Sequence, residues 1–189
     1  AGNITAHWIG YCEYSTPVGE TVTQSCSFCN GKCTFACEPV ISNRPKMLGY
    51  QASGSAPFVR GGPVKNPETV ATAIRIGNPQ SYDQALKVMS ESGGWFDELS
   101  DQEILDTQRL LAMSEGIFCE PASAASLGGA IRDIKSGKIA EGSVIVCTLT
   151  GNGLKDPDTA IGQCQSSVLK TIDATLDQVR DSILQSMGV

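Results

Sequence analysis

The segment that most constrains the fold is the continuous apolar run from Ser143 to Leu149. A run of this length without polar alternation is typical of a strand that is covered on both faces. Such strands occur in parallel sheets that lie between two layers of helices. The run therefore predicts a layered α/β protein, and the rest of the chain has to supply the helices.

Helix start and stop signals are frequent between residues 66 and 137. Asn66-Pro67-Glu68 has the form of a helix start, and Ser100 with Glu103 forms a capping box. Glycines punctuate the stretch and mark where helices end. The signals predict four helices, which run from Pro67 to Gly77, from Ser81 to Gly93, from Ser100 to just before Gly116, and from Pro121 to near Gly137. A last, amphipathic helix is predicted from the apolar stripe of Val168, Ile172, Leu176, Val179, Ile183 and Met187.

Shorter strands are predicted at Lys46–Gln51 and Ile117–Cys119, so strands and helices alternate along the chain. This alternation predicts an α/β fold with three layers and a mainly parallel sheet. Near the start, Ile4, Trp8 and Tyr11 share one helical stripe. Residues 12–45 break all periodicity, and the chain is accordingly divided into segments 1–14, 15–45 and 46–189.

Composition and charge exclude several classes of function. The chain is 41% hydrophobic and 18% charged, as is usual for a soluble globular protein. The net charge is −6 and no cluster of basic residues is present, so a nucleic-acid partner is not expected. No apolar run approaches the ~20 residues of a membrane span, so no membrane association is predicted. The first residues lack the pattern of a signal peptide, and they lack an initiator Met, which suggests an incomplete chain or one that has lost its Met.

Three segments place polar groups where ligands bind in open α/β sheets, at strand ends and helix starts. Ala1-Gly2-Asn3 precedes a helix whose backbone N–H groups can bind an anion, although any helix needs such a start. The apolar run ends at Thr150, followed by Gly151-Asn152-Gly153, which is also the form of an ordinary strand exit. Glu120 precedes Pro121, and its carboxylate is either a site residue or a common helix-start acid.

Together these segments resemble the threonine synthase family, of the tryptophan synthase β-like group of pyridoxal-phosphate enzymes. The resemblance covers residues 1–14 and about 45–160, in the family's order. It is carried by Ala1 to Ala6, Lys46 to Ala52, Glu68 to Pro79, Gly116 to Ala125 and Cys147 to Pro157. One such motif would be weak evidence, but five in order are specific.

The resemblance implies the large-domain portion of a fold-type-II pyridoxal-phosphate lyase, with pyridoxal 5'-phosphate as cofactor and O-phospho-L-homoserine as substrate. It implies that the phosphate-binding loop ends with Ala1, Gly2 and Asn3, and that Thr150 faces the pyridine nitrogen of the cofactor. It also implies that the full-length protein forms a homodimer. A neutral hydroxyl at that nitrogen moderates carbanion delocalisation, which suits elimination and replacement. Threonine dehydratase and cysteine synthase, which share the fold, are the alternatives among enzymes.

The family's Schiff-base lysine lies in a Ser-Phe-Lys-Asp motif that these residues do not contain. Lys155 belongs to a different part of the family pattern, so no catalytic residue is predicted in the chain. By this expectation the chain is an incomplete part with little activity of its own. Segment 1–14 is then the end of the phosphate loop with its helix, and 46–189 is a portion of the cofactor-binding domain. The expected location of the protein is the cytoplasm, and a plastid is the alternative location.

The segment 15–45 departs from the family because it is longer and rich in cysteine. Four thiols in a C-x2-C-x3-C-x3-C pattern could hold zinc or an iron–sulfur cluster. The spacing is not that of paired zinc-ribbon knuckles, so an unstructured insertion or a mis-predicted gene segment is favoured over a metal site, and no metal ligand is predicted. A non-catalytic metal-binding module stays open as the alternative outside enzymes. The cysteines are Cys26, Cys29, Cys33 and Cys37.

Overall fold

The computed structural model describes residues 1–15, 41–163 and 171–186 of the chain. The chain divides into two compact units, Ala1–Asp156 and Pro157–Val189. In the first unit the elements are α1 (Gly2–Tyr14), β1 (Leu48–Ala52), α2 (Pro57–Arg60), η1 (Thr72–Ile74), α3 (Tyr82–Ser92), β2 (Trp95–Leu99), α4 (Asp101–Glu115), α5 (Pro121–Lys135) and η2 (Gly153–Lys155). The second unit contains α6 (Pro157–Gln163) and α7 (Leu176–Ser186).

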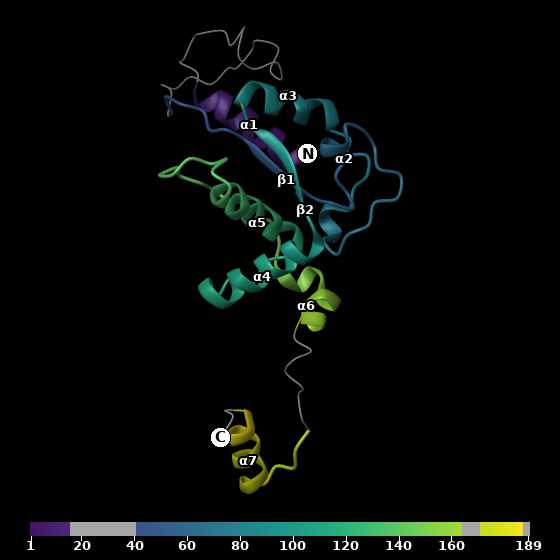
Figure 1. Ribbon diagram of the computed structural model, residues 1–189, viewed down its shortest axis with the longest axis vertical. Helices are drawn as coiled ribbons and strands as arrows, with labels where there is room; N and C mark the ends of the chain where they lie inside the picture. Colours follow the sequence, from purple (N-terminus) through teal and green to yellow (C-terminus); the bar gives the residue numbers. More distant parts are fainter. Residues whose placement is uncertain (16–40, 164–170, 187–189) are drawn as a thin grey trace. The chain divides into compact units, whose positions relative to one another are not determined.

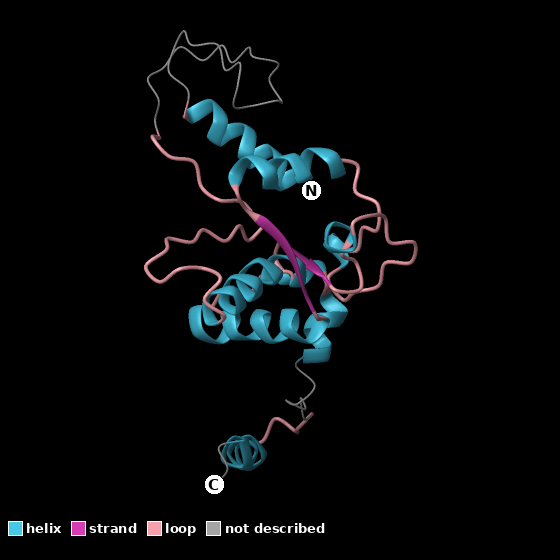
Figure 2. Cartoon of the chain, turned by 45° about the horizontal axis from the view of Figure 1, so that its top comes forward, coloured by secondary structure: helices cyan, strands magenta, loops and turns pink. Residues whose placement is uncertain are grey.

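Two parallel strands form the middle layer of the first unit. The register runs from Leu48 opposite Trp95 to Ala52 opposite Leu99. Helices α1 and α3 lie on one side of the strands, and α5 and α4 lie on the other (Figure 1). The same order of layers is visible when the molecule is turned (Figure 2). The α/β class, the parallel pairing and the layered arrangement predicted from the sequence are confirmed.

The main core lies between the strands and the helices α4 and α5. Ala52 and Leu99 lie opposite each other on the paired strands, so both side chains point to the face that this helical layer covers. Ile104 of α4 completes the contact and is fully buried. Burial of a side chain such as Leu99 or Ile104 contributes about 1.5–3 kcal/mol each. Leu111, Cys119, Ala124 and Ala125 belong to the same cluster.

A second cluster packs α1 and α3 against the other face of the strands. Trp8 and Cys12 from α1 are buried against Val88 and Met89 from α3. Phe96 of β2 lies at the edge of this cluster. Its ring also stacks on Phe58 with the ring centroids 4.1 Å apart, and Phe58 stacks on Tyr82 at 4.7 Å.

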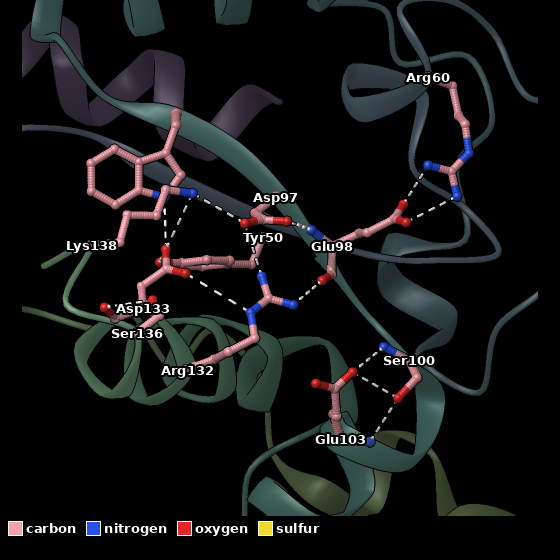
Figure 3. Close-up of polar contacts among 11 residues, drawn as sticks. Tyr50, Arg60, Asp97, Glu98, Ser100, Glu103, Arg132, Asp133, Ser136 and Lys138 are labelled. Carbon is pink, nitrogen blue, oxygen red and sulfur yellow. Dashed lines mark hydrogen bonds and ion pairs between the residues drawn. The ribbon is translucent and has the colours of Figure 1, made fainter.

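An ionic network fastens α5 to the strands through Asp133 (Figure 3). The buried Asp133 carboxylate accepts hydrogen bonds from the Tyr50 hydroxyl at 2.6 Å and from the Trp95 indole at 2.7 Å. Burial and the bond to Asp133 raise the pKa of Tyr50, so this hydroxyl stays a donor. Lys138 lies 3.7 Å from the same carboxylate.

Several helix ends agree with the sequence signals because those signals act locally. The Ser100 hydroxyl accepts from the Glu103 amide at 3.2 Å, and the Glu103 carboxylate accepts from the Ser100 amide at 2.7 Å. The hydrogen bonds that the Glu103 carboxylate accepts from the Ser100 amide and hydroxyl lower its pKa. Gly93 and Gly116 end α3 and α4 in the left-handed conformation, where a side chain would be strained.

The helix predicted from Pro67 to Gly77 is wrong. Only the short turn η1 forms there, because the backbone donors of this stretch bond to distant groups. The Glu68 amide donates to the Gly54 carbonyl at 3.0 Å, and the Val70 amide donates to the Asp101 carboxylate at 3.0 Å. Those partners outweigh the local helix start.

Strand β2 was not expected, because its acidic residues hide the pattern of a strand. Asp97 and Glu98 occupy positions where apolar alternation would be needed. Both carboxylates have ion-pair partners in the folded chain: Arg132 lies 3.0 Å from Asp97, and Arg60 lies 2.8 Å from Glu98. Burial raises the pKa of Asp97, but the Glu98 amide, Lys138 and Arg132 lower it below its ordinary value overall.

The strands predicted at Ser143–Leu149 and Ile117–Cys119 are also wrong as regular strands. Among the described residues, Cys119 makes one isolated bridge, to Asn152. Residues 143–149 follow irregular backbone, and Val144 and Val146 are 94% and 82% exposed. A strand exists only with a hydrogen-bonded neighbour, and this stretch is paired to neither β1 nor β2.

In the second unit, α7 confirms the predicted helix between Leu176 and Ser186, whereas Ile172 of the predicted stripe lies outside the helix. Val168 and Met187 of the predicted stripe lie outside the described residues, as do the four clustered cysteines. None of the helices in the described ranges has both the length and the apolar character needed to cross a bilayer.

Candidate functional site

Two segments from distant parts of the sequence meet at the start of α5. Residues 118–120 run antiparallel to residues 151–153. The Glu120 amide donates to the Gly151 carbonyl at 2.9 Å, and the Gly153 amide donates to the Phe118 carbonyl at 3.1 Å. The contact brings Thr150 to the N-terminus of α5.

The glycines in this contact are required by close approach. A side chain at Gly151 would overlap the Glu120 carboxylate, and one at Gly153 would overlap the Phe118 ring. Asn152 between them turns the chain, since its side-chain oxygen accepts the Leu154 amide at 3.0 Å. The Gly-Asn-Gly sequence therefore lets residues 150–155 lie directly against α5.

Three side-chain oxygens form a compact cluster here. The Thr150 hydroxyl lies 3.0 Å from the Glu120 carboxylate and 3.0 Å from the Ser123 hydroxyl. Glu120 and Ser123 are buried, at 1% and 2% exposure, whereas Thr150 is exposed. Thr150 is therefore the accessible end of a buried polar network.

The same network fixes the backbone at Thr150. The Ser123 hydroxyl accepts the Thr150 amide at 2.9 Å and the Gly151 amide at 3.3 Å. Ser123 belongs to the first turn of α5, which Pro121 opens. A rigid helix thus holds the position of the Thr150 main chain.

Lys155 supplies the charge that the buried Glu120 needs. Its ammonium lies 2.8 Å from the Glu120 carboxylate, which raises the pKa of Lys155. A buried carboxylate without a partner is strongly disfavoured, and Lys155 supplies that partner. Next to it, the Thr72 hydroxyl donates to the Asp156 carboxylate at 2.6 Å and ties the segment to η1.

The second predicted group, Ala1-Gly2-Asn3, forms the N-terminus of α1. Ala1 is the N-cap and contributes no side-chain cap, so the first amides of the helix can bind an anion. Open space surrounds the position that a Gly2 side chain would take. The contacts of this group are local, such as the bond from the Thr5 hydroxyl to the Ala1 carbonyl at 3.1 Å.

Of the predicted residues, the structure gives Thr150 and Glu120 a shared network. Sequence reasoning missed Ser123 and assigned no partner to Lys155. A hydroxyl three residues after Glu120, on the same helical face, was the available signal for Ser123. The role of Lys155 depends on how the two segments meet, which no local pattern encodes.

Cys147 is half-buried, and burial raises the pKa of its thiol.

The residues present fit a pyridine ring and a phosphate. An accessible hydroxyl suits a ring nitrogen, and a helix N-terminus with an open glycine suits a phosphate. Among the described residues no group of three or more His, Cys, Asp or Glu side chains has the arrangement of a metal site. The four clustered cysteines lie outside that range, so the metal hypothesis stays open there.

Comparisons with known proteins identify the class of cofactor. A family model described as "Pyridoxal-phosphate dependent enzyme" matches residues 30–151. The threonine synthase of Mycobacterium leprae is 46% identical over 92% of this chain and 42% of that protein. The threonine synthase of a Bacillus species is 43% identical over 97% of this chain and 46% of that protein. That of Methanocaldococcus jannaschii is 41% identical over 91% of this chain and 41% of that protein. The chain thus spans less than half the length of these relatives.

Proposed function

This chain belongs to the family of pyridoxal-phosphate dependent enzymes, and on that premise we propose that the full-length protein is a threonine synthase. The reaction proposed converts O-phospho-L-homoserine and water to L-threonine and phosphate. The observation that carries the proposal is identity above 40% to threonine synthases over nearly the whole chain. A homodimer and a cytoplasmic or plastid location remain predictions from the resemblance.

The site supports the proposal through the type of group it presents. Pyridoxal phosphate supplies an electron sink that stabilises carbanions next to the substrate's amino group. Thr150 is the residue proposed to face the ring nitrogen. Its hydroxyl is neutral and cannot hold that nitrogen protonated as a carboxylate would, and Glu120 behind it is already paired with Lys155. This arrangement favours elimination and replacement at the substrate side chain.

Binding of the cofactor phosphate is proposed for the backbone amides of Ala1, Gly2 and Asn3. Amides at a helix N-terminus point along the axis, and the helix dipole favours a negative charge there. The absence of a side chain at Gly2 lets an anion approach the main chain. In this proposal the chain contributes phosphate binding and the ring-nitrogen contact, and the Schiff-base lysine comes from outside the residues given.

The test is a substrate assay on the full-length protein loaded with pyridoxal phosphate. We expect phosphate release from O-phosphohomoserine together with an equal amount of threonine. Ammonia release from threonine, without phosphate release from O-phosphohomoserine, would show a dehydratase and overturn the proposal. Thr150→Val should lower kcat/KM by about 10-fold or more, because it removes the hydroxyl proposed to bond to the ring nitrogen. Thr150→Ser, which keeps the hydroxyl, is the matched control.

A further inference from the structure

The Glu120 carboxylate lies buried beneath Thr150, and each of its oxygens needs a donor. Lys155 lies 2.8 Å from Oε2. At Oε1 two hydroxyls are available, from Thr150 at 3.0 Å and from Ser123 at 3.5 Å. A carboxylate at 1% exposure cannot obtain these bonds from bulk water.

The direction of each bond follows from counting protons. A serine hydroxyl has two lone pairs and one proton. The Ser123 oxygen accepts two backbone amides, from Thr150 at 2.9 Å and Gly151 at 3.3 Å, which occupies both lone pairs. Its own proton is therefore left for the Thr150 oxygen at 3.0 Å or for Glu120 Oε1.

Thr150 also has a single proton, which can point to only one partner at a time. When it points to Glu120, the hydroxyl cannot donate to a group on its exposed side. When it points outward, Glu120 Oε1 loses that donor. The network tolerates the second state only if another donor reaches Oε1.

We propose that Ser123 is this second donor and therefore a positioning residue for Thr150. By turning its proton from the Thr150 oxygen to Glu120 Oε1, Ser123 keeps the buried carboxylate satisfied while Thr150 donates to the cofactor's ring nitrogen. Lys155 keeps its ion pair in both states. The inference rests on the proposed function, since it requires a ring nitrogen at Thr150.

The test measures the Kd of pyridoxal phosphate for the full-length apoprotein by fluorescence titration. Ser123→Ala should raise the Kd by about 10-fold or more, because the outward state of Thr150 then leaves a buried carboxylate oxygen unpaired. Ser136→Ala is the matched control. It lies at the other end of α5, where its hydroxyl donates to the Asp133 carbonyl at 3.1 Å, and should change the Kd by less than about 2-fold.

A double-mutant cycle separates positioning from loss of structure. If Ser123 acts through the Thr150 hydroxyl, Ser123→Ala should change the Kd much less in a Thr150→Val background. The same fold-change in both backgrounds, or a Kd for Ser123→Ala within about 2-fold of wild type, would overturn the inference.

A second substitution covers the case in which Ser123→Ala fails to fold. Ser123→Cys keeps the size of the side chain with a weaker donor, so its Kd should lie above that of wild type. A wild-type Kd for Ser123→Cys overturns the inference as well. A wild-type protein that does not bind pyridoxal phosphate at all overturns the proposed function instead, so the two failures are distinguishable.

Discussion

Asp133 shows how one buried charge organises its neighbours. Its carboxylate accepts from Tyr50 and Trp95 and lies near Lys138, so three elements of the first unit depend on it. Asp133→Ala should lower the free energy of unfolding by about 2–4 kcal/mol, because it leaves buried donors without an acceptor. Urea unfolding of the full-length protein measures this.

The control for Asp133 is Asp106→Ala, on the exposed side of α4. Its carboxylate accepts from the Gln102 amide at 2.8 Å at the surface. We expect a change within about 0.5 kcal/mol. Equal losses for the two variants would show that burial of Asp133 does not matter.

Glu103 gives a prediction about pH. Its pKa lies below the ordinary value of 4.5 because the Ser100 amide and hydroxyl bond to its ionised form. A folded-state pKa below the unfolded one stabilises the protein above the unfolded pKa, and this stabilisation is lost as pH falls through the folded pKa. At pH 7 the free energy of unfolding of the wild type should therefore exceed that of Glu103→Gln by up to about 0.5 kcal/mol, as measured by thermal unfolding. This difference should vanish at low pH. A difference that grows in acid would contradict the assignment.

At the scale of single residues, sequence reasoning succeeded where the chemistry is local. The capping box at Ser100 depends only on Glu103, three residues further along the chain. Ser123 and Lys155 could not be assigned a role, because their partners lie 27 and 35 residues away in sequence, counted from Ser123 to Thr150 and from Glu120 to Lys155. Charged and hydroxyl side chains have many possible partners, and only the fold selects among them.

Helix α5 packs on β1 through a glycine. A side chain at Gly129 would overlap the Tyr50 ring, whereas Gly10 in α1 has nothing near the position of an added side chain. Gly129→Ala should destabilise the protein by about 1–3 kcal/mol, since helix and strand have to move apart. Gly10→Ala should stabilise by about 0.5–1 kcal/mol, because alanine loses less backbone entropy in a helix. Thermal unfolding compares the two, and a stabilising Gly129→Ala would contradict this packing.

Among the elements, α3, α4 and α5 could be predicted and β2 could not. The three helices carry their own start and stop signals. The strand carries Asp97 and Glu98, which become acceptable only when Arg132 and Arg60 reach them from other elements. The prediction of a helix at residues 67–77 was wrong for a related reason, because Gly54 and Asp101 accept hydrogen bonds from the backbone amides of this stretch.

At the scale of the whole molecule, the apolar run 143–149 is the largest discrepancy between pattern and structure. Val144 and Val146 are almost fully exposed, although the run is typical of a strand covered on both faces. The chain spans less than half the length of its threonine synthase relatives. We therefore predict that further residues of the full-length protein pair with this run and cover it.

Hydrogen exchange on the full-length protein tests this prediction. The amides of residues 143–149 should exchange slowly, as in a buried strand. Val146→Lys should destabilise by more than about 2 kcal/mol, because it would bury an unpaired charge. Met113→Lys, at an α4 position that is 80% exposed, should change stability by less than about 0.5 kcal/mol. Fast exchange across the run would contradict the prediction.

The close contact of Gly151 with Glu120 also limits how this protein can diversify. Any larger residue at 151 needs a smaller one at 120, and that exchange removes the group that both Lys155 and Thr150 use. Gly153 is tied to Phe118 in the same way. In a saturation library, Gly151 and Gly153 should accept larger residues only when Glu120 or Phe118 is replaced by a smaller one in the same variant. Variation should accumulate instead at Leu154, whose side chain is 73% exposed.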